Sequence, residues 1–141
     1  MPRLPGPAAR DLFAAARVAR LASVSALGQP HIVPCVFALD GDLVYSAVDG
    51  KPKTTRDLQR LANIRSRPEV ALLADQYTED WASLWWVRAD GDAAILDTPA
   101  QMAGPIRLLT ARYPQYQAVP PPGPVIAITV RNWSGWTATS P

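Results

Sequence analysis

The sequence has few cysteine, histidine and lysine residues. The shortages of cysteine and histidine each exclude one kind of structural or binding feature. With Cys35 as its single cysteine, the chain cannot form an internal disulfide, so we expect a protein of the reducing cytoplasm. His31 is the single histidine, which excludes a metal site built from several histidines. We expect His31 to be a structural residue and Cys35 to be a buried, inert thiol.

Long apolar runs and clustered charge are also missing. No apolar stretch reaches the roughly 18 to 20 residues that a membrane-spanning helix needs, and the first residues lack the apolar core of a secretory signal. The net charge is only +2, and the arginines are scattered from Arg3 to Arg131 without interleaved aromatic residues. We therefore expect neither a membrane nor a nucleic acid as partner, and a single globular domain over residues 1–141.

The two lysines of the chain lie two positions apart in the stretch 51–56, whereas the other 12 of the 14 basic residues are arginines. Thr54 is a favourable N-cap, and Asp57 three residues later completes a pattern similar to a capping box, which predicts a helix start. The unpaired backbone N–H groups, hydroxyls and ammonium groups would together hold a phosphate or carboxylate. A charged surface turn before an ordinary helix is the alternative interpretation.

Hydrophobic periodicity predicts helices separated by short strands. Helices are predicted over 8–19, over 54–65 and from Thr98, and strands over 20–26, 31–39, 43–48, 69–74, 83–88 and 125–130. The segment 93–96 either continues the preceding strand or pairs back on it, and the proline-rich segment 113–124 is predicted to be an exposed connection. This order indicates a mainly β fold with helices (α+β), a six- to seven-stranded antiparallel barrel, and not a doubly wound parallel sheet.

Three local features refine this prediction. Pro34 lies within a predicted strand, so its missing N–H must fall at a bulge or an unpaired edge. In the helix over 54–65 we expect Leu58, Leu61, Ala62 and Ile64 to face the core, leaving Arg56, Arg60, Asn63 and Arg67 mainly on the other side. Trp85 and Trp86 are adjacent in one strand, so both of its faces need cover, one of them by a partner subunit or a planar ligand.

Several stretches in this order carry a resemblance: 29–37, 42–47, 51–58, 63–73 and 81–88. Together they resemble the pyridoxamine 5′-phosphate oxidase-like split β-barrel superfamily, whose fold is an FMN-binding split barrel. Within it, the chain is most similar to the small actinobacterial oxidoreductases that use the deazaflavin coenzyme F420. The resemblance is strongest over residues 21–94, about the first two thirds of the chain.

The resemblance implies a homodimer with two cofactor sites at the subunit interface. Residues that would hold the cofactor phosphate are Lys51, Lys53, Thr54, Thr55 and Arg56, while Arg60 would reach the same anion or a polyglutamate tail. Residues that would line the ring are Val33, Pro34, Cys35, Ser46 and Ala47. Trp85 and Trp86 would close the site from the partner subunit, and the residues do not indicate which of the two faces it.

Two classes of function follow from the resemblance. The first is an F420-dependent oxidoreductase that transfers a hydride to an electron-poor small molecule, with FMN as the alternative cofactor. The cofactor carries the hard chemistry, so the lack of an obvious catalytic set of residues fits this class. The second is a non-catalytic carrier that binds a cofactor, haem or a lipid-like ligand. A lone His31 could ligate haem axially, although nothing else in the sequence supports this role.

Overall fold

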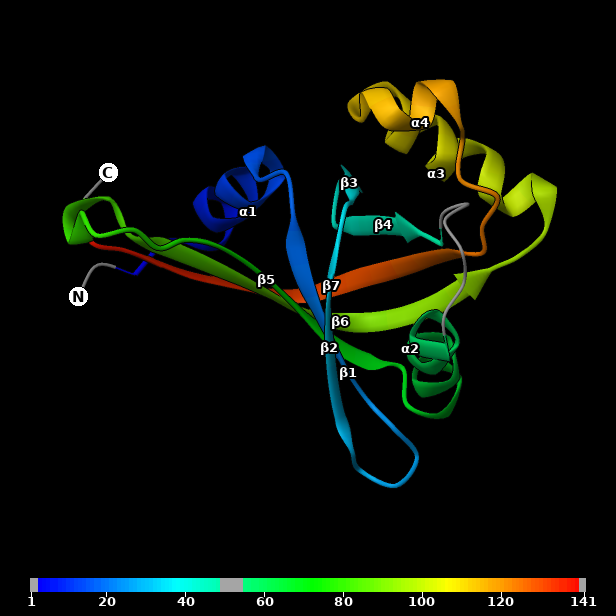
Figure 1. Ribbon diagram of the computed structural model, residues 1–141. Coiled ribbons are helices and arrows are strands. Elements are labelled where there is room, and N and C mark those ends of the chain that lie inside the picture. The colour runs from blue at the N-terminus through cyan, green and yellow to red at the C-terminus, as the bar shows by residue number, and fades with distance from the viewer. Residues whose placement is uncertain (1–2, 49–54, 140–141) are drawn as a thin grey trace.

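The computed structural model describes residues 3–48 and 55–139 of the chain. The helices are α1 (Gly6–Ala15), α2 (Thr55–Ser66), α3 (Pro99–Arg112) and α4 (Pro114–Ala118), with a short 3-10 helix η1 (Trp81–Ser83). The strands are β1 (Ala19–Val24), β2 (Pro30–Cys35), β3 (Ala38–Asp40), β4 (Leu43–Ala47), β5 (Glu69–Gln76), β6 (Trp85–Leu96) and β7 (Val125–Thr137). Figure 1 shows the strands crossing at the centre of the molecule, with α2 on the opposite side from α1.

The strands form one 7-stranded sheet in the order β2-β1-β5-β6-β7-β4-β3, and every neighbouring pair is antiparallel. Its two edge strands, β2 and β3, follow each other in the chain with only Val36 and Phe37 between them. The end of β2 and the start of β3 are thus three Cα steps apart, and three steps span at most about 11 Å. The sheet must therefore curl until its two edges approach one another. This confirms the mainly β, antiparallel fold with helices that the sequence predicts.

The strand predicted over 31–39 is therefore wrong, because the structure divides it into β2 and β3. The Tyr113 hydroxyl accepts from the Phe37 backbone N–H at 3.1 Å and lies 2.9 Å from the Phe37 carbonyl, to which it donates. Because the Tyr113 side chain bonds both the N–H and the carbonyl of Phe37, this residue is not part of a strand. The chain passes here from one edge of the sheet, β2, to the other edge, β3. Pro34 lies on the edge strand β2, one of the two positions predicted for it.

The exposed connection predicted over 113–124 is wrong for residues 113–118, whereas 119–124 form no helix or strand. Its first residues form α4, and Tyr113 and Tyr116 are only 6% and 8% exposed. Both rings pack with Leu109 in a second core between α3, α4 and the strands β3 and β4. The prolines misled the prediction because Pro114 occupies the first turn of a helix, where its missing N–H costs nothing.

Strand β6 is continuous from Trp85 to Leu96, so 93–96 continues the strand and does not pair back on it. It pairs with β7 along its length, with one register shift between Asp90 and Gly91. A Cβ on Gly91 would lie 2.3 Å from the Thr129 carbonyl oxygen, so only glycine fits at this bulge. Strand β7 is longer than predicted, because this pairing extends to Thr137.

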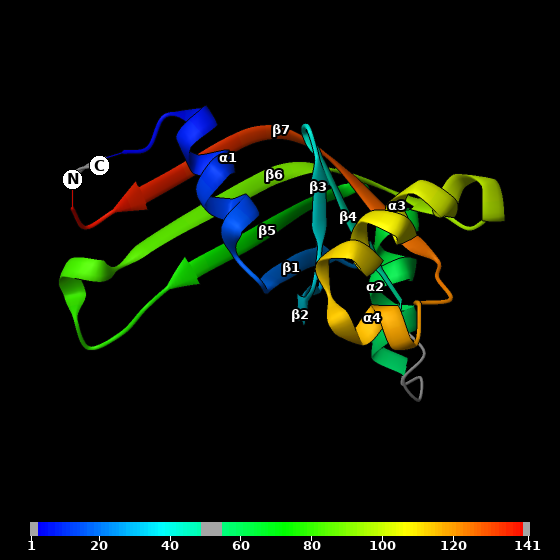
Figure 2. The ribbon, with the colours of Figure 1, turned by 90° about the horizontal axis from the view of Figure 1, so that it is seen from above.

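Helix α1 covers one face of the sheet, where it lies across β6 and β7 (Figure 2). Its Phe13 ring packs against Phe37 and Trp133, with ring centroids 4.7 and 5.3 Å apart. We call this covered side the inner face, and the opposite side of β2, β1, β5 and β6 the outer face. No helix in the ranges 3–48 and 55–139 is long and apolar enough to cross a membrane.

Candidate functional site

Helix α2 begins at Thr55, which agrees with the helix start predicted at Thr54. Lys51, Lys53 and Thr54 lie outside the described residues, and so do the side chains of Thr55 and Arg56. The phosphate-binding role predicted for these five residues stays a prediction.

The buried face of α2 differs from the predicted one. Leu61 and Ile64 are buried as predicted, but Arg60 and Asn63 are also buried, at 7% and 1% exposure, and Ala62 is exposed. Positions 60, 61, 63 and 64 form one continuous stripe of a helix, so α2 is turned by part of a turn from the predicted orientation. Polarity misled the prediction because it cannot show that a buried polar residue has a partner elsewhere in the chain.

Cys35 and Ser46 meet beneath α2, although they come from strands β2 and β4. The Ser46 side chain hydrogen-bonds the Cys35 thiol, and the positive charges of Arg60 and Arg20 act on it. Burial nevertheless dominates and raises the pKa of Cys35 above its ordinary value, so the group stays a neutral thiol near pH 7. This agrees with the buried, inert thiol predicted for Cys35.

A line of polar side chains, of which Asn63 and Ser23 are buried, joins α2 to the other end of β1. Asn63 Nδ2 donates to Ser23 Oγ at 3.0 Å, and Asn63 Oδ1 accepts from Gln59 Nε2 at 2.6 Å. Ser23 lies directly opposite His31 in the β1–β2 ladder. His31 Nδ1 is buried and has no hydrogen-bond partner in the part of the chain that the structure describes.

The remaining residues predicted to line a ring lie in three places. Val33 packs against the main core, to which Cys35 also belongs, two positions along the same face of β2. Ala47 packs into the second core with Leu109, and Pro34 is exposed on the outer face. The structure thus brings Cys35 into contact with Ser46 and places Pro34 and Ala47 away from them.

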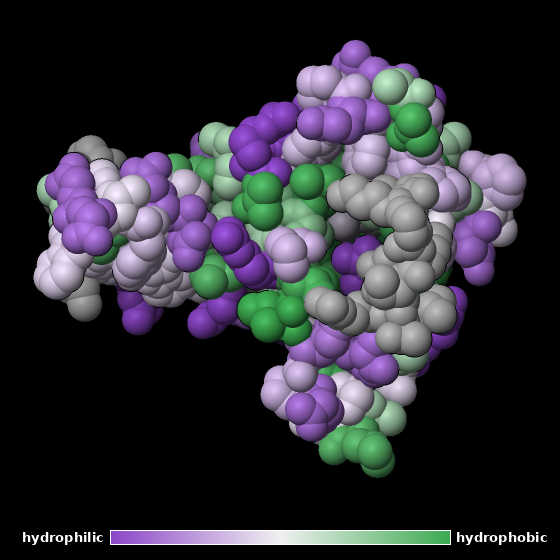
Figure 3. Space-filling model, in the orientation of Figure 1, coloured by the Kyte–Doolittle hydropathy of each residue, from purple (hydrophilic) through white to green (hydrophobic). Residues whose placement is uncertain are grey.

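Trp85 and Trp86 point to opposite faces of β6, as their adjacent positions require. Trp85 packs against the main core, whereas Trp86 lines an open groove of about 480 Å³ on the outer face. The other residues lining this groove are Arg20, Ala22, Ile32, Ala71, Leu72, Leu73, Asp75, Tyr77 and Arg88. Figure 3 shows apolar surface at the centre of the molecule, bordered by hydrophilic side chains.

The outer-face groove was not predicted as such from the sequence. Arg20, Ala22, Leu73 and Arg88 sit at alternating positions that face the same way, but only the strand register shows that they are neighbours. An Arg20–Asp75 ion pair, 3.8 Å between Nη1 and Oδ1, crosses the groove from β1 to β5. The groove therefore combines an apolar floor with guanidinium groups.

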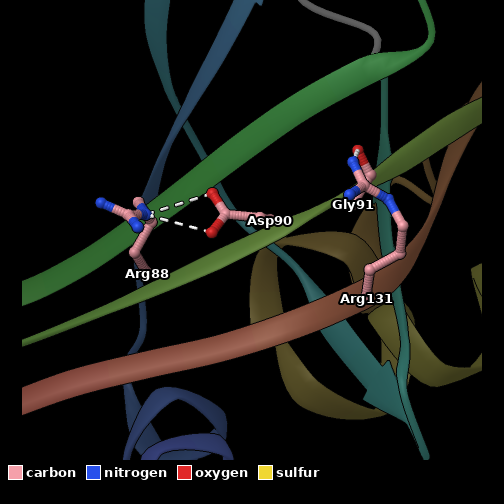
Figure 4. Close-up of polar contacts among 4 residues, drawn as sticks. All are labelled: Arg88, Asp90, Gly91 and Arg131. Carbon is pink, nitrogen blue, oxygen red and sulfur yellow. Dashed lines mark hydrogen bonds and ion pairs between the residues drawn. The ribbon is translucent and has the colours of Figure 1, made fainter.

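Two arginine–aspartate pairs flank the β-bulge, whose extra residue is Arg131 on β7. Figure 4 draws Arg88 with Asp90, and Arg131 beside Gly91. Arg88 Nε donates to both carboxylate oxygens of Asp90, at 3.1 and 3.2 Å. Arg131 on β7 donates from Nε to Asp92 at 2.8 Å, and its side chain reaches the Gly91 carbonyl at 3.4 Å. The Arg88 side chain is about half exposed, and its contact with Asp90 aims the guanidinium along the outer face.

Among the described residues, no three His, Cys, Asp or Glu side chains form a cluster that could hold a metal ion. The positive charge of Arg60 acts on the buried Cys35 thiol, which the Ser46 side chain hydrogen-bonds. A cation and a hydroxyl in this region would suit an organic anion or a polar ring edge.

Comparison with known proteins identifies one family. The sequence model described as pyridoxamine 5′-phosphate oxidase matches residues 6–137. No curated protein sequence matches the chain.

Solved structures share the fold at low sequence identity. An FAD-binding protein from Mesorhizobium loti is 21% identical with a TM-score of 0.74, and 95% of each chain is covered. A conserved hypothetical protein from Mycobacterium tuberculosis is 19% identical with a TM-score of 0.76, covering 96% of this chain and 86% of the other. The heme storage protein HutZ from Vibrio cholerae is 11% identical with a TM-score of 0.66, covering 89% and 88%. These likenesses show the fold alone.

Proposed function

The chain belongs to the pyridoxamine 5′-phosphate oxidase family, and from this premise we propose that it is an oxidoreductase that binds coenzyme F420, with FMN as the alternative cofactor. In this proposal the cofactor phosphate lies at the start of α2, against Lys51 and Lys53. The substrate is an electron-poor small molecule that accepts a hydride.

The observation that carries this proposal is the contact between Cys35 and Ser46, with the positive charge of the buried Arg60 acting on the thiol. These residues come from β2, β4 and α2, and all three belong to the set predicted to bind the cofactor. Arg60 lies within α2, the helix that follows the lysine stretch, and is only 7% exposed, and its positive charge acts on the buried Cys35 thiol, which supports an anionic or polar ligand at this end of the sheet. The FAD-binding relative with the same fold supports a flavin-type cofactor.

The bound cofactor would supply hydride transfer, and the chain's own residues have simpler tasks. The lysines and the first N–H groups of α2 would bind the phosphate, since a helix start favours negative charge. Arg60 is buried, so its role is to hold charge close to Ser46 and not to bind a solvated polyglutamate tail. Cys35 stays protonated and takes no part as a nucleophile.

A homodimer formed through the outer face belongs to the same proposal. This face carries an open groove with Trp86 on it, and Ile32 and Tyr77, which also line it, are 64% and 63% exposed. Apolar side chains gathered on one side of a sheet favour burial against a second subunit. Trp86 would then be the tryptophan that faces the partner, and Trp85 the one that stabilises the subunit.

Cofactor titration tests the proposal. Fluorescence titration of the purified protein with F420, FMN and FAD should show saturable binding of one of them, and FMN carried through purification would make the protein yellow. Reduced cofactor should then be consumed in the presence of a chromogenic acceptor. Absence of binding by all of them would contradict the proposal.

A non-catalytic carrier remains the second candidate, because a heme storage protein shares the fold. His31 is the only histidine available as an axial ligand, and since its Nδ1 is buried, haem would have to be bound through Nε2. A haem titration with a Soret band that is lost in His31→Ala would favour this candidate over the oxidoreductase.

A further inference from the structure

The outer-face groove is hollow because two alanines lie opposite each other at its floor. Ala22 on β1 and Ala71 on β5 are partners in the ladder, and both line the groove. Larger side chains surround them, with Ile32 on the β2 side and Leu73 two positions further along β5. The groove volume of about 480 Å³ is that of a small-molecule site.

The walls of the groove are partly aromatic. Trp86 and Tyr77 both line it, and Tyr77 and Ile32 are largely exposed to solvent. Aromatic rings stack on other flat ring systems, and a ligand in the groove would remove this apolar surface from water. The groove therefore favours a flat, largely apolar molecule.

Arg88 supplies the groove with a cation whose hydrogen bonds are only partly used. Its Nε donates to both carboxylate oxygens of Asp90 (Figure 4), whereas Nη1 and Nη2 donate to no residue that the structure describes. Asp90 lies directly opposite Ala71 in the β5–β6 ladder but does not itself line the groove. Asp90 thus holds the guanidinium beside the alanine floor, with donors left for an anion.

The second arginine of the groove is already compensated. Arg20 lies across Leu73 from Arg88 in the strand register. Its Nη1 is 3.8 Å from Oδ1 of Asp75, which also lines the groove. Asp75 would repel a second anion there, although the lining as a whole has two arginines to one aspartate. The groove charges therefore favour a single carboxylate, placed at Arg88.

We propose that the outer-face groove binds a flat, apolar molecule with one carboxylate, and that Arg88 binds this carboxylate. The apolar part of the ligand lies over Ala22 and Ala71. The inference rests on the proposed function in one respect, since it assigns the hydride-accepting substrate to this chemical class. In the proposed dimer, the second subunit covers the occupied groove from outside.

Direct filling of the groove by a second copy of the chain fits its charges less well. Two-fold symmetry brings the same lining to both sides of such a contact, so the arginine excess is doubled. Like charges brought together across an interface oppose association. A carboxylate bound between the subunits removes this repulsion.

Two probes of the same shape test the inference: naphthoate and naphthamide, substituted at the same ring position. They differ only in the charge of one group. The readout is the ratio of their dissociation constants, amide over acid, measured by isothermal titration calorimetry on the full chain without cofactor. We expect the wild type to bind naphthoate about tenfold more tightly than naphthamide, because a charge-assisted hydrogen bond is made only by the acid.

Three variants locate the site. Arg88→Met keeps an unbranched side chain without charge, so the ratio should fall to about one while naphthamide affinity is retained. Ala71→Leu fills the floor and should weaken both probes about tenfold at an unchanged ratio. Arg131→Met is the matched control, because Arg131 pairs with Asp92 in the same way, is similarly exposed and does not line the groove. Both of its constants should equal those of the wild type.

Each outcome decides the inference. A ratio near one in the wild type, or a ratio that survives Arg88→Met, overturns the role of Arg88. Wild-type affinity in Ala71→Leu overturns the location, and Ala22→Leu decides this point should Ala71→Leu fail to fold. Absence of naphthoate binding at millimolar concentration overturns the ligand site, and a wild-type dimer that dissociates in Ala71→Leu would then identify a second copy as the occupant.

Failure of this inference and failure of the proposed function are distinguishable. Naphthoate binding without any binding of F420, FMN or FAD supports the carboxylate site but removes its assignment to the substrate. Cofactor binding without naphthoate binding overturns the site and leaves the proposed function intact.

Discussion

The Tyr113 hydroxyl satisfies both backbone groups of Phe37, accepting from its N–H at 3.1 Å and donating to its carbonyl at 2.9 Å. These two residues lie 76 positions apart in the chain, and their contact fixes the point at which the chain passes from one sheet edge to the other. Arg112 supports it by donating to the Phe37 carbonyl from 2.9 Å. The residues at the C-terminal end of α3, Arg112 and Tyr113, thus hold the junction that closes the sheet.

Replacing Tyr113 with phenylalanine should lower the free energy of unfolding by about 1–3 kcal/mol, because the buried N–H of Phe37 loses its partner. Thermal and urea unfolding measure the change. Tyr77→Phe is the matched control, since Tyr77 is 63% exposed and the same atom is removed there. Its stability should stay within about 0.5 kcal/mol of the wild type. Equal stabilities of the two variants would contradict the assigned role of Tyr113.

Substituting alanine at two glycines should have unequal effects. Gly91→Ala places a Cβ 2.3 Å from the Thr129 carbonyl oxygen, so the bulge must shift and stability should fall by about 1–3 kcal/mol. Gly104→Ala lies inside α3 with no atom beyond its chain neighbours nearer than 3.9 Å, but it precedes Pro105, whose ring restricts a preceding residue with a Cβ, so the gain in helix propensity is offset and stability should change less than in Gly91→Ala. Urea unfolding of both variants measures the difference, and stabilisation by Gly91→Ala would show that the bulge is not as close as described.

The two tryptophans should separate assembly from stability. Trp86→Ala should weaken the proposed dimer and cofactor binding together, because Trp86 lies on the outer face. Trp85→Ala should instead lower subunit stability, by less than about 3 kcal/mol, because Trp85 is only partly buried against the core. Analytical ultracentrifugation and thermal unfolding distinguish these effects. A wild-type chain that sediments as a folded monomer at micromolar concentration would rule out the dimer.

Removing Lys51 or Lys53 should weaken cofactor binding about ten- to a hundredfold, which corresponds to a charge-assisted contact of about 1.5–3 kcal/mol. Fold stability should change by less than about 0.5 kcal/mol. Arginine at either position should restore binding only in part, since its planar guanidinium fits a tight turn differently from the compact ammonium group of lysine. Cofactor titrations of the single and double alanine variants at two salt concentrations measure this. Full affinity in a folded double variant would refute the phosphate assignment.

The Cys35 thiol should make stability fall at alkaline pH. Its pKa is raised by burial from the ordinary 9.0, so above that pH the unfolded chain loses its proton while the folded chain keeps it. The stabilisation that the protonated Cys35 thiol contributes is complete below pH 9, and it declines as the pH rises toward the pKa of Cys35 in the folded protein. Urea unfolding between pH 7 and 10.5 measures the decline. Cys35→Ala should show a smaller decline than the wild type, and identical profiles would contradict the assigned burial.

The strands could be predicted because each carries a local signal. Gly28 and Gly41 occupy the turns expected after β1 and β3, and both have positive φ, which glycine adopts without strain. Thr98 begins α3 as predicted and forms a capping box with Gln101. Alternation, turn residues and caps are properties of a few neighbouring residues, so the sequence displays them directly.

The errors have the opposite origin, since each involves a partner far along the chain. Asn63 was assigned to solvent because its partner Ser23 lies 40 residues away. Phe37 was assigned to a strand because the Tyr113 hydroxyl that replaces its ladder partner is remote. The outer-face groove requires the register of three strands, which no single stretch reveals. Local patterns predicted the elements, whereas the site depends on contacts between them.

The central place of β7 has a consequence for synthesis in the cell. β7 pairs with β6 on one side and β4 on the other, so the strands β2-β1-β5-β6 and β4-β3 share no ladder until β7 is added. During translation both groups would carry an open strand edge until residues 125–137 leave the ribosome. Open edges invite pairing with other nascent chains, and such long-range pairing is slow. Production of this protein should therefore be sensitive to chaperone supply and to ribosome stalling before β7 has emerged.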